Sequence, residues 1–313
     1  MPRIVELAGG VGGAKLADGL QAVVGADLTV VVNSGDDLER HGLAIWPDHD
    51  TVVYTLAGLD DEARGWGLAD ESWTVVDTLA QRGEDAWFRL GDRDIATHLV
   101  RTERLRRGDR PTHVARALAS SLGVAATVLP MTDDAVRTEV RTDDGWLEFQ
   151  EYFVHRGQAP EVHEVRFRGI EAAAPSPEVL AAIEAAEAIV IAPSNPIVST
   201  GPILAVPGMR PALLAAAGRG TPIVAVSGIV GGRALKGPAD RMLASLGHEP
   251  SARGVATLYA GLADGFVLDE VDRDLADSIA ALGLRTLVTD TIMTDDAARE
   301  RLAREVLAFA AAR

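Results

Sequence analysis

Short apolar runs, each followed at once by small or polar residues, recur along most of this sequence and constrain its fold more than any other feature. They are RIVELA before GGVGG, LTVVV before NSGDD, AIVIA before PSNP, PIVAV before SGIVGG, GFVL before DE and TLV before TDT. Helical stretches lie between several of them, at 14–24, 177–186, 211–218 and 295–312. Strands that are apolar on both faces and alternate with helices are typical of a doubly wound, mostly parallel sheet. We therefore expect an α/β, Rossmann-like fold.

Two regions interrupt this alternation. Residues 60–125 are charged and read as helical, whereas RTEVRTDDGWLEFQEYFV, at 137–154, alternates around a DDG turn and predicts an antiparallel hairpin. We expect residues 1–59 and 176–313 to form the sheet core that binds nucleotide and metal. Residues 60–175 should form an inserted helical and β-hairpin cap beside it.

The charge balance limits the partners of this chain. Lys and Arg total 30 and Asp and Glu total 46, so the net charge is −16, which argues against a nucleic-acid partner. The absence of cysteine excludes disulfides, thiolate metal sites and a Cys nucleophile. No unbroken apolar stretch reaches about 18 residues, so we expect no membrane span. The start, MPRIVELAGG, is interrupted too early for a secretory signal, and we expect a cytoplasmic protein.

The segment GGVGGAKLADGL follows the first expected strand and opens a helix. Glycines there let backbone N–H groups approach a phosphate, and the helix N-terminus favours negative charge. The segment is not a P-loop, because Ala14 and Leu16 replace the required Gly and Ser or Thr, and Lys15 stands in place of the third glycine of a dinucleotide fingerprint. A tight strand–helix turn without a ligand is the alternative. We predict anion binding by Gly9, Gly10, Gly12, Gly13 and Lys15.

Four carboxylates gather after the second expected strand, although the chain is already strongly negative. Asp36 and Asp37 follow that strand together with Asn33. Asp48 and Asp50 lie in PDHDT, before an expected helix that Asp50 could cap. A lone Asp at such a place is most often a helix or turn cap. Four caps in so short a stretch are less plausible than one metal site, and hard oxygen ligands suit Mg²⁺.

The segment LGDRDIATH predicts a helix that begins with Asp92 as its cap. One helical turn then aligns Arg93 with Thr97, and Asp94 with His98. A solvated amphipathic helix is the alternative. The later segment PMTDD is interpreted as a turn. It would belong to the site only if it faced the ligand-binding cleft at the carboxyl ends of the strands.

The segment APSNPIVSTGPI combines a strand end with an expected helix start. Prolines flank Ser194 and Asn195, and Ser199 and Gly201 precede Pro202. Hydroxyls and free N–H groups at such a place suit a nucleotide base or phosphate, although turn chemistry alone is the alternative. No Ser–His–Asp order and no GxSxG elbow is present, so we do not expect a hydrolase of that kind.

Taken together, GGVGGAK, NSGDD, PDHDT, GDRDIATH, PMTDD, PSNPIVSTGPI and TDTIMTD occur in order over nearly the whole chain. They resemble the 2-phospho-L-lactate transferases of coenzyme F-420 biosynthesis, including actinobacterial members that use phosphoenolpyruvate. The resemblance implies a transferase that moves a phospholactyl or phosphoenolpyruvyl group from a guanosine diphosphate ester to the ribityl hydroxyl of the deazaflavin Fo. GMP is released, and F-420-0 or its dehydro form is made.

The resemblance also implies site residues. Asp37 and Asp50 would be catalytic and would hold Mg²⁺. Fo would contact Asp50 and, in the cap, Arg93, Thr97 and His98. The guanosine diphosphate part would lie against the Gly9–Lys15 segment and against Ser194, Asn195, Ser199 and Gly201. A homodimer is the expected assembly.

One departure and two other interpretations stay open at this point. His49 stands between two acids where an apolar residue is expected, either as an extra ligand or as a surface substitution. A nucleotide-sugar-binding regulator of a related family would share the glycine loop but lack the paired acids. A nicotinamide dehydrogenase is disfavoured by the incomplete fingerprint and by Asp36 and Asp37, where one ribose-binding acid is enough.

Overall fold

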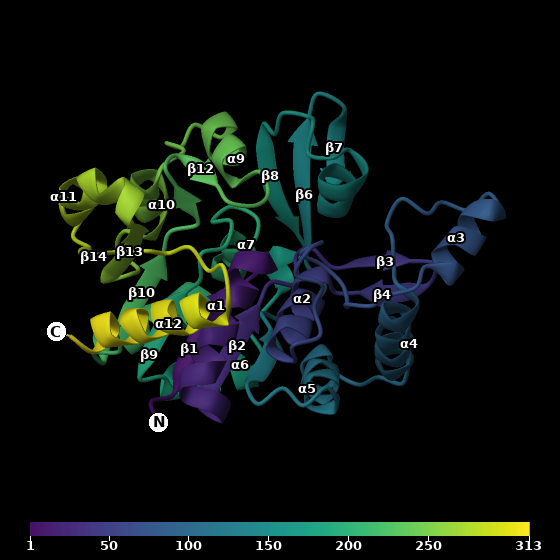
Figure 1. Cartoon of the computed structure of the whole chain (residues 1–313), viewed down its shortest axis with the longest axis horizontal. Coiled ribbons are helices and arrows are strands. Elements are labelled where there is room, and N and C mark those ends of the chain that lie inside the picture. Colours follow the sequence, from purple (N-terminus) through teal and green to yellow (C-terminus); the bar gives the residue numbers. More distant parts are fainter. Residues whose placement is uncertain (313) are drawn as a thin grey trace.

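The computed structural model describes residues 1–312 and is built around a seven-stranded parallel sheet (Figure 1). The strand order is β14–β13–β10–β9–β1–β2–β5. The strands are β1 (Ile4–Ala8), β2 (Leu28–Val32), β5 (Thr127–Pro130), β9 (Ala188–Ile191), β10 (Ile223–Val226), β13 (Gly265–Asp269) and β14 (Arg285–Thr289). The chain runs outward from β1 in both directions, so the switch point of the sheet lies between β1 and β9, where such folds bind ligands.

Different helices cover the two faces of this sheet. On β1, Val5 and Leu7 contribute to one core cluster, whereas Ile4 and Ala8 contribute to the other. The first face packs against α6 (Pro177–Ala185), α7 (Thr200–Ala205), α8 (Met209–Gly218), α9 (Ala239–Ser245), α10 (Ala252–Tyr259) and α11 (Ala276–Ala280). The second packs against α1 (Gly10–Val24), α2 (Pro47–Leu56), α5 (Pro111–Ser121) and α12 (Asp296–Ala311). The predicted doubly wound α/β class is confirmed.

The remaining elements form an arm and a small antiparallel sheet beside the core (Figure 1). The arm contains β3 (Leu38–Arg40), β4 (Leu43–Ile45), α3 (Thr74–Gln81) and α4 (Asp92–Arg106). The small sheet has the order β7–β6–β8, with β6 (Arg137–Thr142), β7 (Gly145–Glu148) and β8 (Glu164–Arg168). A further short hairpin pairs β11 (Ile229–Val230) with β12 (Arg233–Ala234).

The predicted hairpin is confirmed over 137–148, and β8 adds a third strand to it. The end of the predicted range differs, because Glu151–His155 form a π-helix. The predicted insert at 60–175 also contains β5, whose residue Val128 pairs with Val30 of the central sheet. The arm and the small antiparallel sheet are therefore separated in the sequence by β5, an edge strand of the central sheet.

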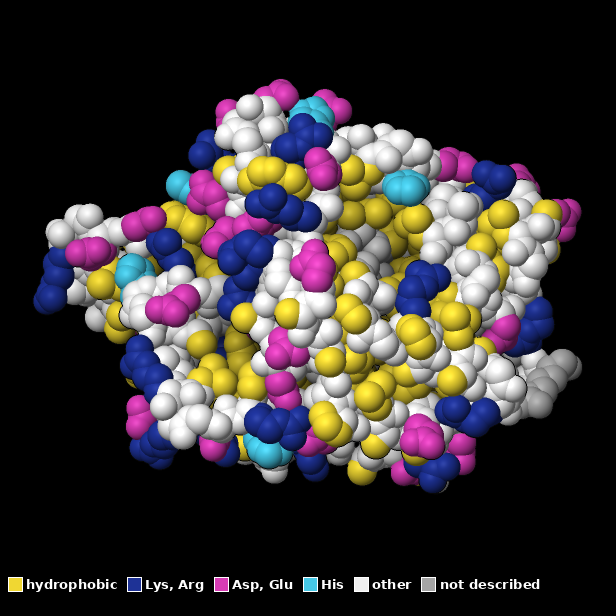
Figure 2. Space-filling model, turned by 180° about the vertical axis from the view of Figure 1, so that it is seen from behind, with side chains coloured by type: hydrophobic (Ala, Val, Ile, Leu, Met, Phe, Trp, Pro, Cys, Tyr) yellow, Lys and Arg dark blue, Asp and Glu magenta, His cyan; other side chains and the backbone are white. Residues whose placement is uncertain are grey.

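Charged side chains are mixed on the molecular surface. On the face shown in Figure 2, Lys and Arg are interspersed with Asp and Glu, and apolar side chains lie between them. Within residues 1–312, no helix combines the length and the apolar character that crossing a membrane requires.

Helices α1 and α12 approach each other closely at Gly19. A Cβ at this position would overlap the backbone carbonyl of Arg299 in α12. The Arg299 side chain is buried and pairs with Asp18 of α1 at 3.1 Å and with Asp296 at 3.1 Å. It also pairs with Glu62, which belongs to the loop leading into the arm. This contact therefore ties the last helix to both the core and the arm.

We predict that Gly19→Ala lowers the free energy of unfolding by about 1–3 kcal/mol, because the added methyl group must push α1 and α12 apart. Chemical denaturation checks this value. Gly218→Ala in α8 is the matched control, since a Cβ there meets no atom within 4 Å, and its stability should be unchanged or slightly raised. Equal effects of the two substitutions would contradict the close approach.

Candidate active site

The turn after β1 brings the glycine-rich segment against the loop that follows β9. The Gly9 N–H donates to Ser194 Oγ at 3.2 Å, and Ser194 Oγ donates to the Gly9 carbonyl at 2.7 Å. A Cβ at Gly12 would overlap the Pro193 carbonyl, and a Cβ at Gly13 would overlap Ser194 Oγ. These two glycines are thus needed for close strand–helix packing, whatever else the segment binds.

Helix α1 begins at Gly10, earlier than expected, and its first N–H group already meets a carboxylate. Gly10 has φ +63° and donates to Asp48 Oδ1 at 2.9 Å. Within residues 1–312, nothing accepts from the N–H groups of Val11 and Gly12. Lys15 follows one turn later in the same helix. Free donors, the positive helix end and an ammonium group together suit an anion.

Asn33, at the end of β2, joins three segments of the site. Its Nδ2 donates to Asp48 Oδ2 at 2.9 Å and to the Val198 carbonyl at 3.2 Å. Its Oδ1 accepts from the Gly35 N–H at 2.8 Å. Burial raises the pKa of Asp48 to about 6, although Asn33 and the N–H group of α1 donate to the carboxylate. Asp48 therefore sits as a buried acid at the mouth of the glycine segment.

The predicted cap role of Asp50 is wrong. Helix α2 begins at Pro47, because proline is favoured at the first helical position. Asp50 consequently lies inside the first turn, and no side chain caps this helix.

The 194–201 segment lies next to the glycine segment, but most of its polar groups shape its own turn. Asn195 Oδ1 accepts from the Ile197 N–H at 2.9 Å. A Cβ at Gly201 would approach the Pro196 carbonyl at 3.0 Å. Ser199 precedes α7, and its Cβ is a near neighbour of Gly9. Ser194 and Ser199 therefore face the glycine segment, whereas Asn195 and Gly201 serve the turn.

Asp36 and Asp37 are buried between β2 and β3. Burial raises the pKa of both carboxyl groups. The charge of Asp48 raises the pKa of Asp36 further. The charges of Arg137 and Arg101 lower the pKa of Asp37, whereas those of Asp50 and Asp48 raise it. Within the described chain, Oδ1 of each residue has no hydrogen-bond partner. Unpartnered buried acceptors are costly, and a cation would satisfy them.

Asp50 forms a buried ion pair with Arg101 of α4, which fixes α2 against the arm. Burial alone would raise the pKa of Asp50, but the charge of Arg101 and the hydrogen bond with His49 hold it well below its usual value. The Arg101 guanidinium also lies 4.5 Å from the centre of the Trp46 ring. His49 is buried, so the surface-substitution interpretation of this residue is wrong.

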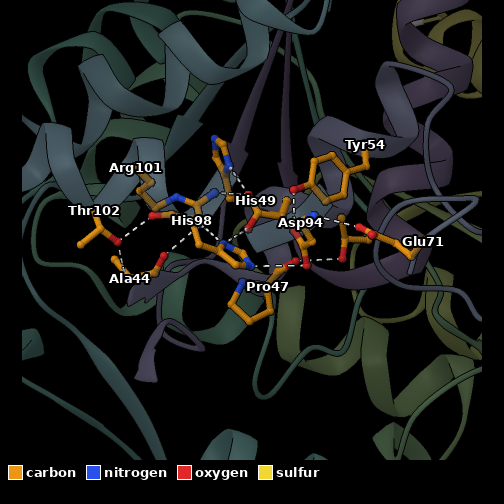
Figure 3. A network of polar contacts seen from close by, with 11 residues as sticks. Ala44, Pro47, His49, Tyr54, Glu71, Asp94, His98, Arg101 and Thr102 are labelled. Carbon is orange, nitrogen blue, oxygen red and sulfur yellow. Dashed lines mark hydrogen bonds and ion pairs between the residues drawn. The ribbon is translucent and has the colours of Figure 1, made fainter. Parts of the chain in front are cut away.

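The Asp50–Arg101 pair continues into a network along α4 (Figure 3). Arg101 Nη1 lies 3.0 Å from His98 Nδ1, and His98 Nε2 lies 3.3 Å from Asp94 Oδ2. The Tyr54 hydroxyl donates to Asp94 Oδ1 at 2.6 Å. The predicted alignment of Asp94 with His98 is confirmed, and the amphipathic helix presents this polar stripe inward.

The start of α4 differs from the prediction. Glu71 accepts from the N–H groups of Arg93 at 2.9 Å and Asp94 at 2.8 Å, so Glu71 caps this helix. Asp92 is the first helical residue and instead accepts from two N–H groups at the start of α3. The predicted cap role of Asp92 in its own helix is wrong, because Glu71 reaches this end from the preceding loop.

The predicted Fo contacts fall on two sides of α4. His98 is buried in the network, and Thr97 lies against the Tyr54 hydroxyl. Arg93 is exposed, and its guanidinium donates to the Ala69 carbonyl at 2.8 Å. Of the residues predicted to contact Fo, Asp50 and His98 therefore lie together in the buried network, whereas Arg93 lies on the exposed side of α4.

Asp50, Asp94 and His98 form a possible metal site, because one ligand atom from each lies within 4.8 Å of the others. Arg101 already occupies one side of Asp50, and an imidazole ligand suits transition metals better than Mg²⁺. The unpartnered oxygens of Asp37 and Asp50 offer hard ligands instead. The chemistry of these carboxylates suits a divalent cation, and of the two predicted metal ligands the three-residue group contains Asp50 but not Asp37.

Three members of this site were not predicted from the sequence. Tyr54 lies one helical turn after Asp50, and Arg101 lies three residues after His98. Asp94 was aligned with His98 but not assigned a role. The spacing of i, i+4 and i+7 along α4 places these groups on one face, and that pattern could have revealed Arg101.

The fold and the site define a doubly wound α/β protein that presents an anion-binding helix end beside buried carboxylates, an arrangement suited to phosphate esters. The family model for 2-phospho-L-lactate transferase CofD matches residues 4–307. The chain belongs to this CofD family, and it is a transferase. The resemblance seen in the sequence is thereby confirmed.

Individual relatives extend over the whole length. A phosphoenolpyruvate transferase of Streptomyces griseus is 45% identical over 315 residues, covering 98% of each chain. A 2-phospho-L-lactate transferase of Methanosarcina mazei is 38% identical over 305 residues, covering 97% of this chain and 99% of that one. A crystal structure of a UPF0052 family member from Bacillus halodurans has a TM-score of 0.64 at 15% identity, covering 97% and 98%. That likeness concerns the fold alone.

We predict a pH-dependent effect of Asp48→Asn. A carboxyl group whose pKa is raised on folding stabilises the protein below its unfolded pKa, and this contribution is lost as pH rises through the folded value of about 6. The free energy of unfolding of the variant, relative to the parent, should therefore increase by about 2 kcal/mol from pH 4.5 to pH 7.5. Denaturant titrations with a chelator present measure this difference.

Asp269→Asn is the control, because hydrogen bonds from Val271 and Thr291 outweigh burial and lower the pKa of Asp269. Asp269 titrates below this pH range. The free energy of unfolding of Asp269→Asn, relative to the parent, should therefore not change between pH 4.5 and pH 7.5. A flat difference for Asp48→Asn as well would contradict the raised pKa of that acid.

Proposed function

We propose that this protein transfers a phosphoenolpyruvyl group from its guanosine diphosphate ester to the terminal ribityl hydroxyl of the deazaflavin Fo, in the biosynthesis of coenzyme F-420. The observation that carries the proposal is the position of the α1 N-terminus beside the buried acids Asp37, Asp48 and Asp50. The 45% identity to a relative named phosphoenolpyruvate transferase favours that donor over the phospholactyl ester.

The diphosphate of the donor would lie at the start of α1. Within the part of the chain that the structure describes, the N–H groups of Val11 and Gly12 have no acceptor there, and Lys15 supplies a positive charge. Ser194 and Ser199 border the same space. Gly10 is already held by Asp48, so the anion would meet the donors that follow it.

Asp37 and Asp50 are the residues proposed to hold Mg²⁺, since each has a buried carboxylate oxygen without a hydrogen-bond partner in the described chain. When bound, the ion would offset the repulsion between the acidic protein and the diphosphate. The pKa values of the neighbouring acids Asp36 and Asp48 are raised, and a cation bound there would stabilise the charged forms of both carboxyl groups.

The reaction needs a proton acceptor for the attacking hydroxyl. The ribityl oxygen forms a bond to the distal phosphorus, the anhydride bond of that phosphorus breaks, and GMP leaves with the electron pair. Arg101 makes Asp50 a weak base, whereas burial raises the pKa of Asp37. Of the two acids, Asp37 is therefore proposed as the proton acceptor, through the carboxylate oxygen that does not hold the ion. Arg101 would then act by positioning Asp50.

We predict that Asp37→Asn and Asp50→Asn each lower turnover by roughly 100-fold or more, the scale for losing one electrostatic or proton-transfer group. Mass spectrometry of the product formed from Fo and either donor ester, with GMP quantified in parallel, measures the rate. Asp85→Asn is the matched control, because Asp85 lies on the arm and pairs with Arg40 at the surface at 3.0 Å.

Normal product formation by both variants would contradict the assigned roles. If the parent forms no product and responds to UDP-sugars but not to GDP, the protein is a nucleotide-sugar-binding regulator instead.

We predict that Arg93→Ala weakens Fo binding more than GDP binding. Arg93 lies on the exposed side of α4, in the arm, whereas the proposed diphosphate site lies at the core sheet. Loss of one charge-assisted contact should raise the dissociation constant for Fo about 10-fold. Calorimetry with each ligand separates the two sites. Arg89→Ala, on the same arm and paired with Asp77 at 2.9 Å, should change neither, and an equal loss for both ligands in Arg93→Ala would refute the placement.

A further inference from the structure

Lysine is almost absent from this protein, and the two lysines present lie close together in space. Lys15 and Lys236 are the only lysines in a sequence that contains 30 basic residues, and every other one is arginine. They come from distant parts of the chain, since Lys15 belongs to α1 and Lys236 follows β12. The positive charge of Lys236 nevertheless acts on Lys15.

The position of Lys236 follows from its contact with the arm. A Cβ at Gly65 would overlap Lys236 Nζ, so the ammonium group lies directly on the Gly65 backbone. Gly65 has φ +77°, a conformation in which a side chain is strained, which keeps this surface open to the ammonium group. Lys236 therefore reaches from the core hairpin to the loop that enters the arm.

Lys15 approaches the same region from the other side. Its Nζ donates to the Met293 carbonyl at 2.9 Å, which leaves two of its three donors unused in the described chain. Burial, followed by the charges of Arg299 and Lys236, lowers the pKa of Lys15. Lys15, Lys236 and Arg299 thus lie close together beside α1.

The two lysines are not brought together by ion pairs with acidic side chains. Arg299 is paired with Asp18, Asp296 and Glu62. Within residues 1–312, neither Lys15 nor Lys236 forms an ion pair, although the charges of Glu62 and Asp60 are felt by Lys15. Two unpaired ammonium groups that repel each other indicate a site for an anion with more than one negative charge.

The loop that carries Lys236 starts at the proposed donor site. A Cβ at Gly228 would lie 3.2 Å from the Pro193 carbonyl and 3.3 Å from that of Ser194. The loop then forms the short β11–β12 hairpin and continues to Lys236. Lys15 contacts the Met293 carbonyl beside α12, whereas Lys236 contacts Gly65 on the arm side.

We propose that Lys15 and Lys236 form a clamp for the diphosphate of the donor, with Lys236 as a second phosphate-binding residue on the hairpin loop. This inference rests on the proposed donor site at the start of α1. A lysine ammonium is a compact charge with three freely oriented donors, which suits phosphoryl oxygens. Because Lys236 also touches Gly65, an anion held by the clamp would link the core to the arm.

The scarcity of lysine makes a direct test possible. Reductive methylation with ¹³C-formaldehyde labels only Lys15, Lys236 and the amino group of Met1, and it keeps their charge. Three ¹H–¹³C signals result, and Lys236→Arg assigns one of them by its disappearance. We expect inorganic pyrophosphate, and GDP with Mg²⁺, to shift both lysine signals. Met1 is the internal control, since it pairs with Asp27 at 3.0 Å at the opposite end of the strands.

Binding measurements give the size of the effect. Lys236→Met should weaken pyrophosphate binding by roughly 10-fold or more, the scale for one charge-assisted hydrogen bond. Arg233→Met, an exposed cation on the same hairpin, is the matched control and should bind almost as the parent does.

The outcomes separate the clamp from the proposed function. If pyrophosphate shifts the Lys15 signal alone, the clamp is refuted and the donor site stands. If neither signal moves while the parent still makes product from Fo and the donor, the clamp is refuted and the proposed activity stands. If neither signal moves and no product forms, both proposals fail.

Discussion

The buried ion pair between Asp50 and Arg101 is the interaction on which the rest of the site depends. It joins α2, which packs on the core sheet, to α4 of the arm. Removing one partner of such a pair typically costs about 3–5 kcal/mol, because the other charge stays buried alone. Arg101 also meets His98, which leads to Asp94 and Tyr54. One guanidinium therefore fixes the orientation of several groups that line the site.

The acids beside this pair have no such partner. Asp36, Asp37 and Asp48 are buried, and burial raises the pKa of all three. Buried carboxylates without an ion-pair partner are destabilising in their charged form, so stability alone does not explain this group of acids. The loss of stability that these acids cause is explained if a bound cation and a phosphate ester neutralise the charges of the site during function. The glycine segment, Ser194 and the two lysines supply the corresponding positive and polar surface.

The edge strand β5 was not predicted, because it is short and lies within the charged region at 60–175. The other six strands of the central sheet were predictable, because most of them are buried on both faces and therefore appear as apolar runs. Glu6 is an exception: it lies within one such run and is fully buried in β1, with no partner in the described chain. Contacts between distant segments were not predictable. The capping of α4 by Glu71 and the contact of Lys236 with Gly65 both depend on loops whose paths no local pattern records. Periodicity along α4 did align Asp94 with His98, and extending it by three residues would have found Arg101.

Thermal unfolding at pH 7.5 tests most directly whether the buried acids exist to bind a ligand. A ligand that binds only the folded state raises its stability. MgCl₂ with GDP should therefore raise the melting temperature of the parent. Asp37→Asn should melt at or above the parent temperature without ligand, because one repelling charge is gone, and should respond less to MgCl₂ with GDP. If Asp37→Asn melts early and the parent does not respond to MgCl₂ with GDP, the acids are structural and the account is wrong.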